Sequence, residues 1–269
     1  MESTNENPKC SGRPADSATA QTSCCELFGS DAPQRFRRKC DGCLLRHCLY
    51  PSAQAPAVRR MGRAIKRLEF EPKAALYRDG QSENDLYIIQ SGLVKLVQYP
   101  RFGSARIVRL LHSGDVTGFE ALLGGAYCHR AITLTAAVSC VILRDVVTFL
   151  LDLDSGDHPF RRAMMACWQH HLEAADHWLC GFSTGPAEAR VARLILFFIS
   201  IEQSGDPGSE VRLLCREDMA SVLGLAYESV CREVSKLRVS GALRQLGAGR
   251  YACNTALLEE LSNSTHDLC

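Results

Sequence analysis

The sequence contains no long apolar run. A helix that spans a bilayer needs about 20 predominantly apolar residues, and no stretch of the 269-residue chain approaches that length. The N-terminus is polar and lacks the charged-then-apolar pattern of a secretory signal. These absences argue against a helical membrane protein and predict a protein of the cytoplasm.

The chain also lacks a strong charge of either sign. Its formal net charge is +1, so no bulk electrostatic field points to nucleic acid, and any DNA contact has to come from a local basic patch. No Ser-His-Asp arrangement, glycine-rich phosphate loop or pair of carboxylates at catalytic spacing stands out. The sequence therefore predicts a protein that is not an enzyme.

Cysteine, by contrast, is abundant, with 14 residues. The cytosol keeps thiols reduced, so structural disulfides are not expected, and most scattered cysteines are interpreted as small buried hydrophobes. Cys40, Cys43 and Cys48 are clustered as C-x2-C-x4-C among arginine and lysine residues. Such spacing is typical of thiolate ligands to zinc or an iron–sulfur cluster, and the alternative is unligated cysteines in a flexible arm. A fourth ligand has to come from elsewhere in the chain.

The composition divides the chain into four parts. Residues 1–50 are a polar lead-in that ends in the cysteine cluster, so we expect a flexible arm. Residues 51–158 contain short strand patterns separated by glycine turns, which is typical of a sandwich or barrel. Residues 159–184 predict one long helix, and residues 185–269 predict a helix followed by a helix-turn-helix and a small hairpin.

An apolar stripe runs along the long helix predicted for residues 159–184. Its members recur at helical spacing and are Met164, Trp168, Ala175, Trp178 and Phe182. Such a stripe is either ordinary core or the seam between two helices. We expect it to pair with its copy across a two-fold axis, which predicts a homodimer.

Residues 216–238 fit two short amphipathic helices with a break between them. Apolar residues recur at helical spacing in both halves, at Met219, Ala220 and Leu223 and then at Val230, Val234 and Leu237. Gly224 lies between the halves, where a left-handed backbone conformation favours glycine. The pattern is typical of a helix-turn-helix, whose second helix enters the major groove of DNA.

The exposed face of the second helix carries groups that can read bases. Glu228 and Arg232 are four residues apart and project from one side of the helix. A guanidinium can donate to guanine O6 and N7, and a carboxylate can accept from cytosine N4, so the pair predicts readout of one G·C base pair. The alternative is a surface salt bridge between the two side chains. Cys231 shares this face, and Lys236 and Arg238 further along are expected to contact phosphates.

Four segments resemble signatures of the CRP/FNR family of transcription regulators. They are Leu-Tyr-Ile-Ile-Gln-Ser-Gly at 86–92, Gly-Asp-Val-Thr-Gly-Phe at 114–119, Ala-Glu-Ala-Arg-Val-Ala-Arg at 187–193 and Gly-Leu-Ala-Tyr-Glu-Ser-Val-Cys-Arg at 224–232. The resemblance implies an α+β chain with an N-terminal β-roll sensor of the cyclic-nucleotide-binding jelly-roll type, a long dimerisation helix and a C-terminal winged helix-turn-helix domain. It also implies an inverted-repeat operator with TTGAT-like half-sites and RNA polymerase as a partner.

The cysteine cluster resembles that of the FNR branch of this family. In that branch three N-terminal cysteines and one in the sensor domain hold an oxygen-labile [4Fe-4S] cluster, which implies as ligands Cys40, Cys43, Cys48 and Cys140. Cys128 is the second choice for the fourth ligand. The spacing of the triad is one residue shorter than the commoner C-x2-C-x5-C. Cys231 also departs from the branch, which usually has a serine among its base-contacting residues at that position.

Two other ways of sensing are compatible with these residues. The same cysteines suit a thiol or zinc redox switch, in which they form disulfides or bind Zn²⁺. A response to a cyclic nucleotide is a further alternative, because the resemblance also extends to an arginine of the phosphate pocket in CRP-like proteins. That pocket has a Gly-Glu turn and an Arg-Ser pair, whereas this chain has Gly118-Phe119 and Arg130-Ala131.

Overall fold

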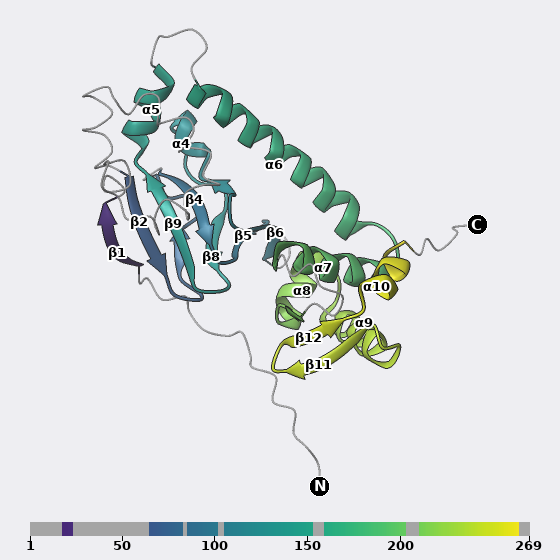
Figure 1. The fold of residues 1–269 in the computed structure, drawn as a ribbon. Helices are drawn as coiled ribbons and strands as arrows, with labels where there is room; N and C mark the ends of the chain where they lie inside the picture. The colour runs from purple at the N-terminus through teal and green to yellow at the C-terminus, as the bar shows by residue number, and fades with distance from the viewer. Residues whose placement is uncertain are drawn as a thin grey trace. The chain divides into compact units, whose positions relative to one another are not determined.

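The computed structural model describes residues 18–23, 65–82, 85–101, 105–152, 159–202 and 210–263, and Figure 1 shows their helices and strands. They form two compact units, one that ends at Ala175 and one that begins at Asp176. The boundary falls inside a long helix, so each half of that helix belongs to a different unit.

The first unit is built on two antiparallel sheets. The five-stranded sheet has the order β1-β2-β9-β4-β7, and the four-stranded sheet has the order β3-β8-β5-β6. The strands are β1 Ala18–Ser23, β2 Ile65–Phe70, β3 Ala75–Tyr77, β4 Leu86–Ser91, β5 Val94–Gln98, β6 Arg106–Leu111, β7 Val116–Thr117, β8 Arg130–Thr133 and β9 Ala137–Ile142.

The five-stranded sheet separates two apolar cores. Leu86 and Ile88 of β4 join one core, while Tyr87 and Ile89, which alternate with them, join the other. Successive side chains of a strand point to opposite faces, so a strand with a core on each side has an unbroken apolar sequence. Gly92 follows β4 with a φ of +89°, and a Cβ there would lie 2.4 Å from the carbonyl oxygen of Ala136. Only glycine therefore fits this turn.

Helices cover one of these cores. α4 is Glu120–Leu123, α5 is Arg144–Asp152 and α6 is Pro159–Ser183. Side chains of α5 and of the first half of α6 pack with residues of β4, β7 and β9. Full burial of one large apolar side chain stabilises a fold by about 1.5–3 kcal/mol, so this core joins α6 firmly to the five-stranded sheet.

The second unit contains the remainder of α6 and a winged helix-turn-helix. Its helices are α7 Ala187–Glu202, α8 Arg216–Leu223, α9 Tyr227–Val239 and α10 Thr255–Ser262, and a three-stranded sheet of order β10-β12-β11 has the strands β10 Glu210–Arg212, β11 Leu243–Gly247 and β12 Arg250–Cys253. Two arginines of α7 bind the end of α6: Arg190 donates to the carbonyl of Phe182 (2.8 Å), and Arg193 donates to the carbonyls of Gly181 (2.7 Å) and Thr184 (2.9 Å).

The expected α+β fold is confirmed, with a β-roll in the N-terminal unit and a winged helix-turn-helix in the C-terminal unit. The long helix predicted for residues 159–184 corresponds to α6, Pro159–Ser183. Among the residues that the structure describes, no helix has both the length and the apolar character needed to cross a membrane.

Candidate nucleic-acid interface

The two helices of the helix-turn-helix meet at Gly224. This residue ends α8 in the left-handed conformation, with φ 59° and ψ 40°. The apolar residues predicted to face the core are buried in both helices, namely Met219, Ala220, Leu223, Val230, Val234 and Leu237. Their burial fixes which side of α9 faces outward.

The outward side of α9 carries most of the predicted DNA contacts. Glu228, Arg232, Lys236 and Arg238 are exposed, and Cys231 is half-buried. Glu228 lies in the first turn of the helix, and Lys236 and Arg238 lie in the last. This placement suits the helix macrodipole, and it puts an acceptor and several donors on a helix with a free face.

Arg232 is paired with a residue that the sequence reasoning did not identify. Its Nε donates to Oε1 of Glu233 at 3.2 Å, and Nζ of Lys236 lies 2.9 Å from Oε2 of the same carboxylate. Glu228 forms no ion pair with any residue in the described part of the chain. The alternative of a Glu228–Arg232 surface salt bridge is therefore wrong, because Arg232 forms its ion pair with Glu233 instead.

Glu233 could have been noticed from its spacing. It falls on the apolar side of α9, next to Val234 and between Val230 and Leu237, and its residue exposure is 3%. An acidic side chain at a position that is otherwise apolar departs from the helical pattern and indicates a specific polar contact.

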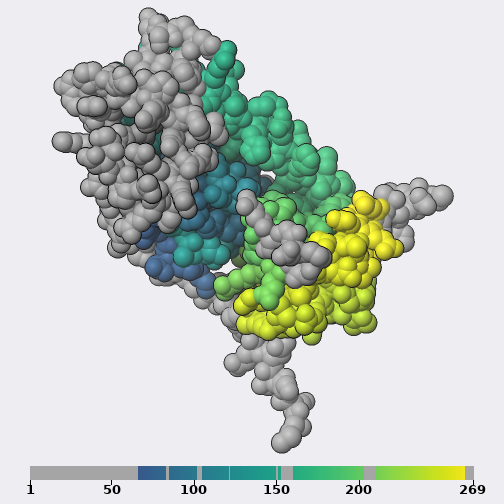
Figure 2. Space-filling view, in the orientation of Figure 1, coloured from purple at the N-terminus to yellow at the C-terminus, as the bar shows by residue number. Residues whose placement is uncertain are grey.

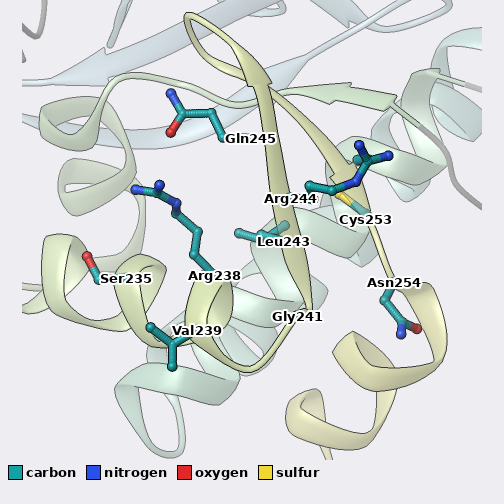
Figure 3. A pocket seen from close by; sticks show the side chains of 10 residues that line it. Ser235, Arg238, Val239, Gly241, Leu243, Arg244, Gln245, Cys253 and Asn254 are labelled. Carbon is teal, nitrogen blue, oxygen red and sulfur yellow. The ribbon is translucent and has the colours of Figure 1, made fainter.

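The wing extends this surface beyond α9. A cleft of about 890 Å³ lies between the end of α9 and the β11–β12 hairpin, and its polar lining includes Ser235, Arg238, Arg244 and Gln245 (Figure 3). In Figure 3 Arg238 and Gln245 lie on the same side of β11 and Arg244 on the other, as the alternation of a strand requires. Arg244 and Gln245 are exposed donors that the sequence reasoning missed, because they lie on the hairpin rather than on the recognition helix.

Of the four predicted cluster ligands, the structure describes Cys140. Cys40, Cys43 and Cys48 lie outside the described residues. Cys140 is at the middle of β9, opposite Arg67 of β2 and Ile88 of β4. It is 4% exposed and belongs to the core that contains α5, α6 and Cys167.

Cys128, the second choice, has different surroundings. It is exposed and precedes β8, and its backbone N–H donates to Oε1 of Glu120 at 3.1 Å. Partial burial and then the negative charge of Glu120 raise the pKa of the Cys128 thiol. Among the described residues, no group of three or more acidic, histidine or cysteine side chains is arranged to hold a metal ion.

The predicted dimer stripe divides between two environments. Met164 and Phe182 are 4% and 7% exposed and pack inside their own chain, and Trp178 packs edge-on against Phe182 with ring centroids 4.7 Å apart. Trp168 is 50% exposed, and Ala175 is half-buried. The large apolar residues of α6 that do face solvent are Met165, Trp168, Leu172 and Leu179. The surface of α6 is visible in Figure 2, where the helix is drawn in green.

The β-roll differs from the cyclic-nucleotide pocket that the resemblance to CRP-like proteins implies. The rings of Tyr77 and Tyr127 stack in the core between the two sheets with centroids 4.0 Å apart, and the ring centroid of Tyr87 lies 5.4 Å from that of Tyr77. Arg130 has a buried Nε without a hydrogen bond to any described residue. In the sequence, Phe119 stands where such a pocket has an acidic residue and Ala131 where it has a hydroxyl, so neither of these two partners of the arginine is present at its position.

Comparison with known proteins identifies both halves of the chain. Residues 67–154 match the model of the cyclic nucleotide-binding domain, and residues 189–261 match that of the Crp-like helix-turn-helix domain. The anaerobic regulatory protein of Pasteurella multocida is 28% identical over 204 residues, which cover 74% of this chain and 73% of the relative. The fumarate and nitrate reduction regulatory protein of Escherichia coli K12 is 28% identical over 196 residues, which cover 72% of this chain and 77% of that relative.

Solved structures show the same fold. A CRP-family transcriptional regulator from Thermus thermophilus superposes with a TM-score of 0.63 and 25% identity, over 75% of this chain and 99% of that one. FixK2 from Bradyrhizobium japonicum has a TM-score of 0.64 and 21% identity, over 75% of this chain and 98% of that one. With its β-roll, its winged helix-turn-helix and these relatives, the chain belongs to the CRP/FNR family and is a DNA-binding transcription regulator, not an enzyme.

Proposed function

We propose that this regulator senses oxygen or nitric oxide through a [4Fe-4S] cluster held by Cys40, Cys43, Cys48 and Cys140, and binds an inverted-repeat operator as a homodimer. The observation that carries the proposal is the position of Cys140, whose thiol lies in the core between β9 and α6. When bound, the cluster supplies reactivity toward oxygen. The names of the relatives, an anaerobic regulatory protein and a fumarate and nitrate reduction regulatory protein, support the same signal.

The donor set suits such a cluster. Thiolates are the usual ligands of iron–sulfur clusters, and an apolar, poorly hydrated shell tunes their stability and potential. Cys140 provides a thiol in such a shell. Cys128 is the poorer donor, because Glu120 is a negative charge beside a ligand that has to lose its proton.

α6 can transmit the state of Cys140 to the dimer. Two buried residues of the sensor core, Met164 and Cys167, and the half-buried His171 are followed by the exposed apolar residues Met165, Trp168 and Leu172. Neighbouring residues on a helix project about 100° apart. A rotation of α6 that moves the residues on the sensor core therefore also moves the exposed apolar residues that follow them. We therefore propose a revised seam of Met165, Trp168, Leu172, Ala175 and Leu179, which recurs every three and four residues as in a coiled coil.

The cluster is tested by the chemistry of anaerobically purified protein. The wild type and the Cys253→Ser control should be brown and contain about four iron and four sulfide per chain, as the cluster formula requires, while Cys43→Ser should be colourless. Cys253 is a matched control because it is buried in the wing. Colourless wild-type protein that contains zinc would instead support the zinc switch and end the iron–sulfur proposal.

A thiol switch is the second candidate. Cys140 and Cys167 belong to the same apolar core, so oxidation of these thiols would also act on the contact between β9 and α6. Operator binding that is lost in air and restored by dithiothreitol alone, without iron and sulfide, would favour this candidate.

DNA readout is proposed to depend on Arg232, Glu228 and Cys231, with phosphate contacts from Lys236 and Arg238. A dimer places its two α9 helices about one turn of DNA apart. We propose that the bound dimer acts with RNA polymerase at the promoter. The test is binding to TTGAT-like duplexes varied one base pair at a time. Arg232→Ala should relax the preference at the G·C pair, which is worth about 1–3 kcal/mol, whereas Arg238→Ala should weaken all duplexes alike.

A further inference from the structure

Glu233 is a buried carboxylate on the inner side of the recognition helix. Its residue exposure is 3%, and its neighbours on that side of α9 are the apolar residues Val230, Val234 and Leu237. Taking a carboxylate out of water is costly, and replacing a buried ion pair by apolar residues is often neutral or stabilising. Fold stability therefore does not explain an acidic residue at this position.

The carboxylate divides its two oxygens between two cations of the DNA-facing side. Oε1 accepts from Nε of Arg232 at 3.2 Å. Oε2 lies 2.9 Å from Nζ of Lys236 but accepts no hydrogen bond from any described residue, so the approach of the ammonium is off the hydrogen-bonding direction and the contact is ionic. The cations themselves are well exposed, with 64% of the Arg232 side chain and 54% of the Lys236 side chain open to solvent.

This arrangement differs from an ordinary surface ion pair. Exposed pairs contribute little because two long side chains lose entropy to meet. Here one partner is already fixed by the packing of α9, so only the cations are ordered. With Nε of Arg232 held, Nη1 and Nη2 are the donors left for the two acceptors of guanine, O6 and N7. Lys236 is drawn back toward the same carboxylate, which reduces its attraction to phosphate.

We propose that Glu233 is a specificity-determining positioning residue, which orients Arg232 for end-on reading of guanine and weakens the sequence-independent phosphate contact of Lys236. The inference rests on the proposed base readout by Arg232. It gives Glu233 two separable effects: its oxygen at Oε1 orients Arg232, and its charge holds Lys236.

The two effects are separated by two substitutions in the full-length, cluster-loaded protein. Glu233→Leu removes both the acceptor and the charge, whereas Glu233→Gln keeps an acceptor for Arg232 and removes the charge. Binding is measured by fluorescence anisotropy on inverted-repeat duplexes with each of the four base pairs at the predicted G·C position, over a series of salt concentrations. Glu260→Gln, on the exposed side of α10, is the control with the same change of charge.

Glu233→Leu should reduce the discrimination for G·C, which is about 5- to 150-fold for one bidentate contact, to less than threefold. Glu233→Gln should keep the discrimination within about twofold of wild type and steepen the slope of log K against log salt by up to about 0.9 per half-site, as the weakened phosphate contact of Lys236 becomes a full one. Glu260→Gln should leave the discrimination and the salt slope unchanged.

Three outcomes would overturn the inference. They are wild-type discrimination in Glu233→Leu, an equal loss of affinity for all four base pairs in Glu233→Leu, and a wild-type salt slope in Glu233→Gln. Thermal unfolding of each variant shows whether it folds, and if Glu233→Leu does not fold, the salt slope of Glu233→Gln still decides. An Arg232→Ala variant distinguishes failure of the proposed base readout from failure of the role of Glu233. If Arg232→Ala lowers the affinity for all four base pairs equally, Arg232 does not read the base pair. If Arg232→Ala loses the discrimination while Glu233→Leu keeps it, only the role of Glu233 is wrong.

Discussion

Cys140 and Cys128 are two thiols of the sensor that differ in what surrounds them. Cys140 is packed among apolar side chains of β4, α5 and α6, whereas Cys128 is exposed beside Glu120. A metal ligand has to be a thiolate, and a neighbouring carboxylate disfavours it. We therefore expect Cys140→Ser to abolish the visible absorption of anaerobic protein and Cys128→Ser to leave iron and sulfide content unchanged. A full cluster in Cys140→Ser together with its loss in Cys128→Ser would reverse this assignment.

We expect His171 to give the contact between α6 and the β-roll a pH dependence. Its ring lies edge-on to Phe119 with centroids 4.9 Å apart, and its Nδ1 contacts Arg109. Burial and then the positive charge of Arg109 lower the pKa of His171 from 6.5 to about 4. In the unfolded chain His171 takes up a proton near pH 6.5, whereas in the folded chain it does so only near pH 4. The free energy of unfolding therefore falls as the pH is lowered from about 6.5 to about 4.

The variant His171→Gln should remove this part of the pH dependence, which amounts to roughly 1–3 kcal/mol of unfolding free energy between about pH 7 and pH 4. Urea unfolding at a series of pH values measures it, with His177→Gln, an exposed histidine of the same helix, as the control. An unchanged slope in His171→Gln would show that other groups cause the acid sensitivity.

At the scale of elements, α6 presents two apolar faces. One packs on the sensor core, and the other consists of Met165, Trp168, Leu172, Ala175 and Leu179. A glutamate at Leu172 would place two like charges near each other across a two-fold seam. We expect Leu172→Glu to sediment as a monomer and Ala166→Glu, at an exposed position off the stripe, to remain a dimer. Dimeric Leu172→Glu protein would exclude this face as the seam.

Helical spacing predicted α6 but not which of its residues face outward. Met164 and Met165 are adjacent, and both continue a pattern of three and four residues. Periodicity gives the spacing of a face, while the choice between neighbouring faces depends on what the helix packs against. Spacing alone therefore predicts Met164 and Phe182 in the seam, whereas the structure buries each of them in its own chain.

The helix-turn-helix was predictable because its signals are local. Gly224 and the apolar residues on either side of it determine the turn and the inner faces of α8 and α9 within a short stretch of sequence. The partner of Arg232 was not predictable in the same way. Spacing of four residues favoured Glu228, whereas the long arginine side chain reaches the adjacent Glu233, whose position is fixed by the packing of α9. The wing donors Arg244 and Gln245 likewise depend on how the hairpin folds back beside α9.

At the scale of the whole molecule, the proposed mechanism links sensing to DNA binding through α6. Its first half packs with Cys140, and its last turn is held by Arg190 and Arg193 of α7, the helix that precedes the DNA-binding elements. The proposed cluster therefore would not need to contact DNA. It only has to favour one association state of α6, and a few kcal/mol of differential stability is enough to shift such an equilibrium from mostly monomer to mostly dimer.

This mechanism predicts that a more stable contact between the two copies of α6 makes the cluster unnecessary for dimerisation and operator binding. Ala175 is the small, half-buried member of the exposed stripe. Ala175→Leu adds apolar surface from both copies, which stabilises the dimer by up to about 5 kcal/mol if it packs without strain. The cluster-free variant should then be dimeric in sedimentation and bind the operator in air, whereas cluster-free wild type should do neither. If cluster-free Ala175→Leu is dimeric but fails to bind the operator, the cluster acts on the orientation of the recognition helices rather than on association.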